Sequence, residues 1–195
     1  MIALVVKRIL FALAWIIVSQ LIALTWIEKA VAGTETERVF GSCKELLSTV
    51  PTLAGGFLRS AYYWSSCTRV SPDAYLHLGS MIAHRDVTIG KGTVIGVHSL
   101  IGYADIGDNV LCGAFVSVIS GKYQHGRPEE RSGGDLVTEV FTRITIGSSS
   151  WIGQGAILLA NVGRQCTVGA GSIVYNEVQE GSTVLGNPAR RVNLK

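Results

Sequence analysis

The longest apolar stretch of the chain lies near its N-terminus and predicts a membrane helix. Residues Ile9 to Ile27 carry no charge over 19 positions, and about 20 residues of helix cross the hydrocarbon core of a bilayer. Lys7 and Arg8 precede this run, so a cleaved signal peptide is a second interpretation, although the run is long for one. We therefore expect residues 1–33 to form a hydrophobic membrane helix.

A second apolar pattern follows and predicts an amphipathic helix. Its apolar residues recur at helical spacing, at Leu46, Val50, Leu53 and Phe57. An aromatic cluster, Tyr62 to Trp64, comes next. Such a segment can lie among lipid headgroups or pack against the core of its own domain, and the sequence leaves both open. We expect residues 34–70 to form an amphipathic helical connector.

From about residue 76 the chain falls into six-residue units. The leading residue of each unit is aliphatic with one exception and is often followed by glycine; these leading residues are Ile89, Ile95, Ile101, Ile106, Cys112, Ile146, Ile152, Leu158, Val162 and Val168. Neither a strand nor a helix repeats every six residues, whereas a triangular coil does. Each unit forms one side, its leading residue points inward, and glycine permits the corner. We expect residues 71–195 to form a mainly β, parallel β-helix.

The repeat is interrupted at residues 120–143, and this interruption predicts a functional loop, because regular coils rarely hold long insertions without a use. The loop contains His125 together with the acidic residues Glu129, Glu130, Asp135 and Glu139. A neutral imidazole, with an ordinary pKa of about 6.5, can accept a proton from a hydroxyl at cellular pH. We therefore expect His125 to be a general base, oriented by the carboxylate of Glu139 or Glu130.

Composition narrows the classes of function. Only 16% of the residues are charged, 48% are hydrophobic, and the net charge is +3 without a basic run, so nothing suggests a nucleic-acid partner. The four cysteines have no zinc-site spacing. No metal site is expected.

Three motifs give the chain a family resemblance. SGKYQHGRPEE around His125, ITIGSSSWIGQGAIL around Trp151 and VLGNPARRV at the C-terminus resemble, in this order, segments of the maltose, galactoside and xenobiotic acetyltransferases. The resemblance covers about residues 76–192. It implies the left-handed parallel β-helix of the hexapeptide-repeat acyltransferases, with the N-terminal membrane-associated helices as an addition.

The resemblance also implies roles for particular residues. His125 and Glu139 are the implied catalytic residues. His98 and Glu130 would bind the acceptor, although His98 stands where the galactoside enzymes usually have asparagine. The residues implied to contact acetyl-CoA are Trp151, Gly153, Arg190 and Arg191. A homotrimer with coenzyme A held between neighbouring subunits is implied as well.

These inferences predict an acetyl-CoA-dependent O-acetyltransferase. Its acceptor would be a sugar hydroxyl on an envelope or exopolysaccharide glycan precursor, and the membrane segment suggests a lipid-linked one; an amino sugar is the nearest variant. Acetyl-CoA is cytoplasmic, so we expect a domain on the cytoplasmic side of a bacterial inner membrane. Lys7 and Arg8 favour a cytoplasmic N-terminus, and a single crossing would then place the domain outside.

Two other classes of function remain as alternatives. A γ-type carbonic anhydrase uses the same coil and needs three histidines on a metal, for which His84, His98 and His125 are available. Their spacing does not resemble the ligands of that family. A non-catalytic membrane scaffold is the other alternative, and the loop histidine argues against it.

Overall fold

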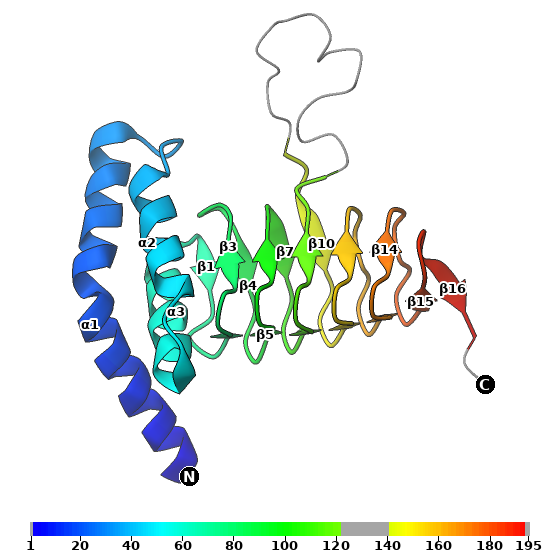
Figure 1. The fold of residues 1–195 in the computed structure, drawn as a ribbon, viewed down its shortest axis with the longest axis horizontal. Coiled ribbons are helices and arrows are strands. Elements are labelled where there is room, and N and C mark those ends of the chain that lie inside the picture. The colour runs from blue at the N-terminus through cyan, green and yellow to red at the C-terminus, as the bar shows by residue number, and fades with distance from the viewer. Residues whose placement is uncertain (1, 122–140, 194–195) are drawn as a thin grey trace, which may run out of the picture.

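The structure, a computed structural model, describes residues 2–121 and 141–193, and three helices precede a parallel β-solenoid in it (Figure 1). The helices are α1 (Ile2–Ala32), α2 (Arg38–Ser48) and α3 (Thr52–Ser66). The expected fold, a β-helix with N-terminal helices, is therefore confirmed.

Three sheets form the sides of the solenoid. Sheet A contains β1 (Arg69–Val70), β4 (Thr88–Ile89), β7 (Ala104–Ile106) and β10 (Ile144–Ile146). Sheet B contains β2 (Tyr75–Leu76), β5 (Val94–Ile95), β8 (Leu111–Cys112), β11 (Trp151–Ile152), β13 (Thr167–Val168), β15 (Thr183–Leu185) and β16 (Arg190–Val192). Sheet C contains β3 (Met81–Ile82), β6 (Leu100–Ile101), β9 (Ser117–Val118), β12 (Ile157–Leu158) and β14 (Ile173–Val174). Neighbouring strands are parallel, except that β16 runs antiparallel to β15.

The inward positions of the coil are those that the repeat predicted. Ile95, Cys112, Ile152 and Val168 stack on one another in sheet B, and each is at most 1% exposed. The other leading residues are equally buried in sheets A and C. Cysteine is accepted among them because a thiol packs like a small apolar side chain. One continuous apolar column therefore fills the solenoid.

The reason for the recurring glycine differs from the expected one. The glycine after each inward residue, as at Gly113 and Gly163, has no positive φ and does not form the corner. A Cβ atom at Gly113 would lie 2.7 Å from the backbone nitrogen of Gln154 in the next turn, and one at Gly163 would lie 2.6 Å from that of Glu180. Glycine is therefore required at Gly113 and Gly163 because the turns stack too closely there for a side chain, whereas on sheet C Ile119 and Leu159 occupy the equivalent position.

The corners themselves use positive φ at another position. There the structure accepts side chains as well as glycine: His98, Asn109, Phe115, Ser149 and Gln165 all have φ between 53° and 62°. Corners from sheet A to sheet B and from sheet B to sheet C keep the six-residue spacing. The corner from sheet C to sheet A, which we call the C–A corner, varies in length. Repeat units with fewer than six residues, among them those that end at Asp105 and Asn161, lie at this corner.

Helices α2 and α3 close the N-terminal end of the solenoid. Tyr62 and Tyr63 of α3 and Phe40 of α2 are fully buried, and the Tyr63 hydroxyl accepts a hydrogen bond from the Ile82 backbone. The aromatic cluster thus serves mainly as core, although Trp64 remains 43% exposed. Because these rings cover the first turn, its apolar column does not end in water.

A buried arginine joins these helices to the coil. Arg59 of α3 is 1% exposed, and its guanidinium donates to the carbonyl oxygens of Leu47 (2.9 Å), Val50 (2.8 Å) and Leu76 (3.1 Å). The Leu47 carbonyl lies in the last turn of α2, the Val50 carbonyl lies between α2 and α3, and the Leu76 carbonyl lies in β2. Burial lowers the pKa of Arg59, yet these bonds compensate for the lost water.

Replacing Arg59 with methionine should therefore destabilise the protein. Three buried carbonyl groups would lose a charged donor, at a cost of about 3 kcal/mol, which lowers the Tm by about 6–12 °C in a domain of this size. Arg69→Met, on the exposed side of β1, is the matched control. Thermal unfolding followed by circular dichroism measures both, and equal Tm values for the two variants would contradict the role of Arg59.

Candidate functional site

The insertion leaves the solenoid at the C–A corner, from a rigid base. The Thr142 backbone donates to the Ser120 carbonyl (2.8 Å), and the Ser120 hydroxyl accepts from the Tyr103 backbone (2.9 Å). Gly121 has a φ of +94°, which favours glycine. Both ends of the insertion are therefore fixed to the preceding turn. The predicted residues His125, Glu130 and Glu139 lie outside the described residues.

A charged cluster stands beside this base. The Arg143 guanidinium lies 3.9 Å from the ring centroid of Tyr103 and donates to Asp86 (2.7 Å) and Asp105 (2.8 Å). The Tyr103 hydroxyl also donates to Asp86 (2.9 Å). Burial pushes the pKa of Asp86 up, but hydrogen bonds from Tyr103 and Thr68 and the charge of Arg143 outweigh it and hold that pKa below its ordinary value.

The residues of this cluster were not among the predicted site residues. Thr68, Asp86 and Tyr103 are separated by one turn of the coil each, 18 and 17 positions along the chain. Residues one turn apart lie above one another. The cluster could therefore have been predicted by aligning the outward residues of the C–A corner in successive turns. Arg143 is the last residue of the insertion, and no spacing indicated its place.

A groove lies between this corner and the N-terminal helices. It encloses about 1270 Å³ and is lined by aromatic side chains together with acidic and hydroxyl groups, chiefly Trp26, Trp64, Glu37, Asp86, Tyr103 and Phe141. Phe141 lies at the C-terminal end of the insertion, and its ring centroid lies 4.7 Å from that of His84. The base of the insertion and the end of α1 therefore face the same space.

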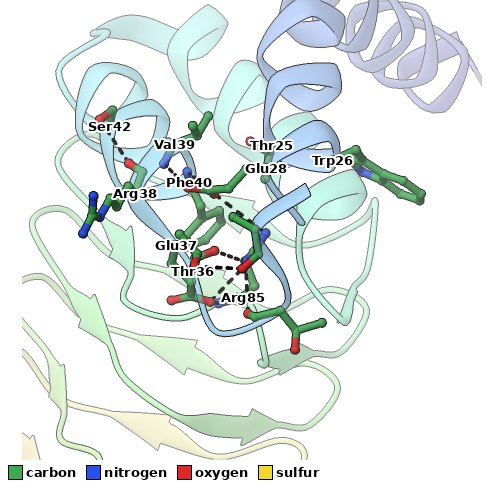
Figure 2. Close-up of polar contacts among 12 residues, drawn as sticks. Thr25, Trp26, Glu28, Thr36, Glu37, Arg38, Val39, Phe40, Ser42 and Arg85 are labelled. Carbon is green, nitrogen blue, oxygen red and sulfur yellow. Dashed lines mark hydrogen bonds and ion pairs between the residues drawn. The ribbon is translucent and has the colours of Figure 1, made fainter. Parts of the chain in front are cut away.

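An ion-pair network forms the inner wall of this groove (Figure 2). Arg85 contacts Glu28 of α1 (3.9 Å) and Glu37 (3.4 Å), and donates to the carbonyl oxygen of Thr34 (3.1 Å) and to that of Thr36. Glu28 also accepts from the first turn of α2, at the backbone of Val39 and Phe40, where negative charge is favourable. The network therefore holds α1, α2 and the coil together.

His98, expected to contact the acceptor, lies at the corner between sheets B and C. Its φ is 53°, and its ring stacks on that of Phe115 one turn later, with centroids 5.5 Å apart. On the other side the ring packs over Gly79, where a Cβ atom would collide with it. His84 instead lies at the C–A corner and bonds to Glu37 (3.2 Å). The two histidines therefore occupy different corners of the triangle.

Trp151 points outward from the middle of sheet B. Its side chain is 47% exposed and follows that of Leu111, 49% exposed, in the parallel register. Gly153 is a stacking glycine, since a Cβ atom there would meet the backbone of Gly169 and Ala170. The fold therefore explains Gly153. It does not explain Trp151, which forms an exposed apolar surface together with Leu111.

Arg190 and Arg191 lie in the final strand of sheet B. Arg190 pairs with Leu185 and Arg191 pairs with Val184. Paired residues of antiparallel strands share a face, and neighbours along a strand alternate. Val184 is buried and Leu185 is exposed, so Arg190 lies on the outer face that also carries Trp151, whereas Arg191 lies on the opposite face at the end of the coil.

The described cysteines are free thiols. Burial raises the pKa of Cys67, which lines the groove, and raises that of Cys112 to about 12. Neither is a thiolate at neutral pH, as a cysteine nucleophile must be. Within residues 2–121 and 141–193, no three His, Cys, Asp or Glu side chains are grouped so that they could hold a metal ion.

Comparison with known proteins gives likeness in sequence and in fold. No family model matches the chain. The bifunctional protein GlmU of a Synechococcus species is 32% identical over 111 residues, which are 56% of this chain and 21% of that protein. The chain thus matches about a fifth of the length of this curated relative.

Two solved structures share the solenoid. A maltose O-acetyltransferase from Clostridium difficile superposes with a TM-score of 0.68 at 19% identity, over 80% of this chain and 84% of that one. A mutant of the N-acyltransferase AntD from Bacillus cereus, in complex with dTDP and coenzyme A, superposes with a TM-score of 0.50 at 16% identity, over 65% and 76%. The chain therefore has the fold found in these acyltransferases, which confirms the resemblance at the level of fold.

The network around Glu37 should make stability depend on pH. Burial raises the pKa of Glu37, but bonds from His84 and the Arg85 backbone, with their charges, lower it below its ordinary value of 4.5. A carboxyl with a lowered pKa stabilises the folded state above its unfolded pKa and loses this effect as the pH falls through its folded pKa. Glu37→Gln should therefore have a lower Tm than the parent at pH 7.

The difference in Tm should shrink as the pH falls below 4.5. Glu45→Gln, on the exposed side of α2, serves as the control and should show no such convergence. Thermal unfolding of the three chains across this range measures the effect. A Glu37→Gln difference that stayed constant down to the acid limit would contradict the assignment.

Proposed function

We propose that this protein transfers an acetyl group from acetyl-CoA to a hydroxyl of a sugar. The acceptor is an envelope or exopolysaccharide glycan precursor, and the reaction takes place at the cytoplasmic face of the membrane. The observation that carries the proposal is the insertion, whose sequence contains His125 and whose ends are fixed to a solenoid like that of a maltose O-acetyltransferase.

His125 is the general base of the proposed reaction. Its imidazole takes the proton of the acceptor hydroxyl while the oxygen attacks the thioester carbonyl carbon. The tetrahedral intermediate then collapses, the carbon–sulfur bond breaks, and the departing sulfur of coenzyme A receives the proton from the imidazolium. Glu139 or Glu130 keeps the imidazole oriented. No acyl-enzyme is formed, so both substrates must be held together.

Coenzyme A binds along the outer face of sheet B in this proposal. Trp151 packs against its pantetheine arm, and Arg190 meets its phosphates. The complex of AntD with coenzyme A supports the choice of acyl donor. Exposed apolar residues on the outer faces of sheets B and C, among them Leu100 and Leu111, favour association of copies of the chain. A homotrimer completes each site with residues of two subunits.

The groove at the C–A corner is suited to a carbohydrate. Trp26 and Trp64 are exposed aromatic residues on which a sugar ring can stack, and Asp86 and Glu37 are acceptors for its hydroxyl groups. The groove lies between the base of the insertion and α1. A precursor anchored in the membrane would therefore enter this groove from the side of α1.

Replacing His125 with alanine should remove most of the activity. The loss of a general base lowers kcat by about 10²- to 10⁴-fold. His77→Ala, at a half-buried position after β2 where the ring packs against Tyr75, should keep parental activity. Acetyl transfer from acetyl-CoA to a panel of sugars and lipid-linked sugars, followed by release of free thiol, measures both variants. Robust transfer by His125→Ala, with an unchanged circular dichroism spectrum in each variant, would reject the general-base role.

The two terminal arginines provide an internal comparison for coenzyme A binding. Trp151→Ala and Arg190→Ala should each weaken coenzyme A about tenfold, because both side chains lie on the outer face of sheet B. Arg191→Ala, on the opposite face of the same strand, should change it by less than about threefold. Isothermal titration calorimetry with coenzyme A alone measures this. Equal effects of the two arginines would count against the proposed path of coenzyme A.

A further inference from the structure

Helix α1 is the outermost layer at the N-terminal end of the protein, and it runs across the long axis of the solenoid (Figure 1). It is attached to the rest of the protein at several points. Lys7 pairs with Asp73 (3.1 Å), the Trp15 indole donates to Ser65 (2.9 Å), and Thr25 bonds to Tyr62 (2.8 Å). Glu28 is buried near its end. α1 is therefore part of the folded domain and has a fixed direction.

The opposite face of α1 is apolar and has no partner in the described chain. Its exposed positions recur at helical spacing along the whole helix and are apolar except for Gln20; they are Val6, Ile9, Leu13, Ile16, Ile17, Gln20, Leu24, Ile27 and Val31. The exposed charges of α1 are basic, because its acidic residue Glu28 is buried; Arg8 lies near one end of the helix, and Lys29 lies near the other end on the side of the groove. Trp26 borders the stripe and is 61% exposed.

A helix that crossed the bilayer in this arrangement would carry the solenoid into it. Because α1 runs across the solenoid axis, a spanning α1 would lay that axis in the plane of the membrane, at the depth of the helix. α3 and the first turn, with the charged residues Arg69, Asp73 and Asp86, would then lie in hydrocarbon. Charged groups in hydrocarbon are strongly unfavourable. The length and hydropathy of α1 permit a crossing, but its packing opposes one.

We propose that α1 is a monotopic helix, which lies in the plane of the membrane surface and binds it through the apolar stripe. Lipid is the occupant that fits: acyl chains match the stripe, anionic headgroups match Arg8 and Lys29, and tryptophan is favoured at this depth. The inference rests on the membrane attachment proposed above but not on acetyl transfer. It removes the conflict over topology, because a helix that does not cross leaves the solenoid on the side where Lys7 and Arg8 remain.

Labelling of single cysteines from each side of the membrane tests the orientation. Arg8→Cys lies near the N-terminal end of α1, Glu35→Cys follows its C-terminal end, and Lys91→Cys reports the solenoid; all three positions are exposed. The full chain in bacterial cells is treated with a charged, impermeant maleimide, in spheroplasts and in inverted membrane vesicles. The parent chain gives the background from its own thiols. We expect all three positions to react in inverted vesicles and none in spheroplasts.

Other outcomes separate this inference from the proposed function. If Arg8→Cys and Glu35→Cys react from opposite sides, α1 spans and the inference is overturned, while the membrane attachment stands. If all three react only in spheroplasts, the helix lies in the plane, but the cytoplasmic reaction is rejected. A chain found in the soluble fraction overturns both the inference and the membrane attachment, and acetyl transfer can still be assayed.

Binding to vesicles tests the stripe directly. Ile16→Glu and Leu24→Glu should each reduce sedimentation of the detergent-free chain with phosphatidylglycerol–phosphatidylcholine vesicles about tenfold. Leu185→Glu, an exposed leucine at the far end of the solenoid, should have no effect. If the α1 variants instead alter the oligomeric state and leave vesicle binding unchanged, a second copy of the chain covers the stripe and the inference is overturned.

Discussion

The close stacking of successive turns is the constraint from which the rest of this structure follows. Parallel strands of neighbouring turns are about 4.8 Å apart, and at Gly113 and Gly163 this distance leaves no space for a Cβ atom. At these places the next turn can stack only because the residue after the inward side chain is glycine, whereas on sheet C the same position also holds Ile119 and Leu159. The repeat of an aliphatic residue and a glycine every six positions is therefore a consequence of this close packing. The same packing makes the solenoid stiff enough to hold a site.

The same limit decides where the chain can vary. Inward positions must be apolar, so length changes are confined to corners, and among the described turns they occur at the C–A corner. This corner holds the shortened units that end at Asp105, Asn161 and Glu177 and the base of the insertion, where Ser120 and Thr142 pair. The changes in length and the candidate functional groups lie at the same corner because the other two corners keep the six-residue spacing.

The periodic part of the structure was predictable, and the parts that depend on single long-range contacts were not. Ile95, Ile152 and Val168 were assigned to the interior from the repeat alone, and they are buried. The repeat did not reveal why glycine recurs, because the spacing shows that glycine is needed but does not show which contact requires it. Arg59 illustrates the other limit: a lone arginine in an apolar helix gives no indication that it will donate to three carbonyl groups from two distant elements.

The N-terminal helices cover the open end of the solenoid, which would otherwise be exposed to water. Its first turn exposes apolar side chains and unpaired strand edges, which invite association with other chains. Here Tyr62 and Tyr63 cover that end, and α1 covers them in turn, bonded through Thr25. The cap is apolar on its outer side as well as its inner side. A membrane surface in contact with α1 would therefore complete the burial that begins inside the coil, and it would bring the groove beside the C–A corner close to the lipid headgroups.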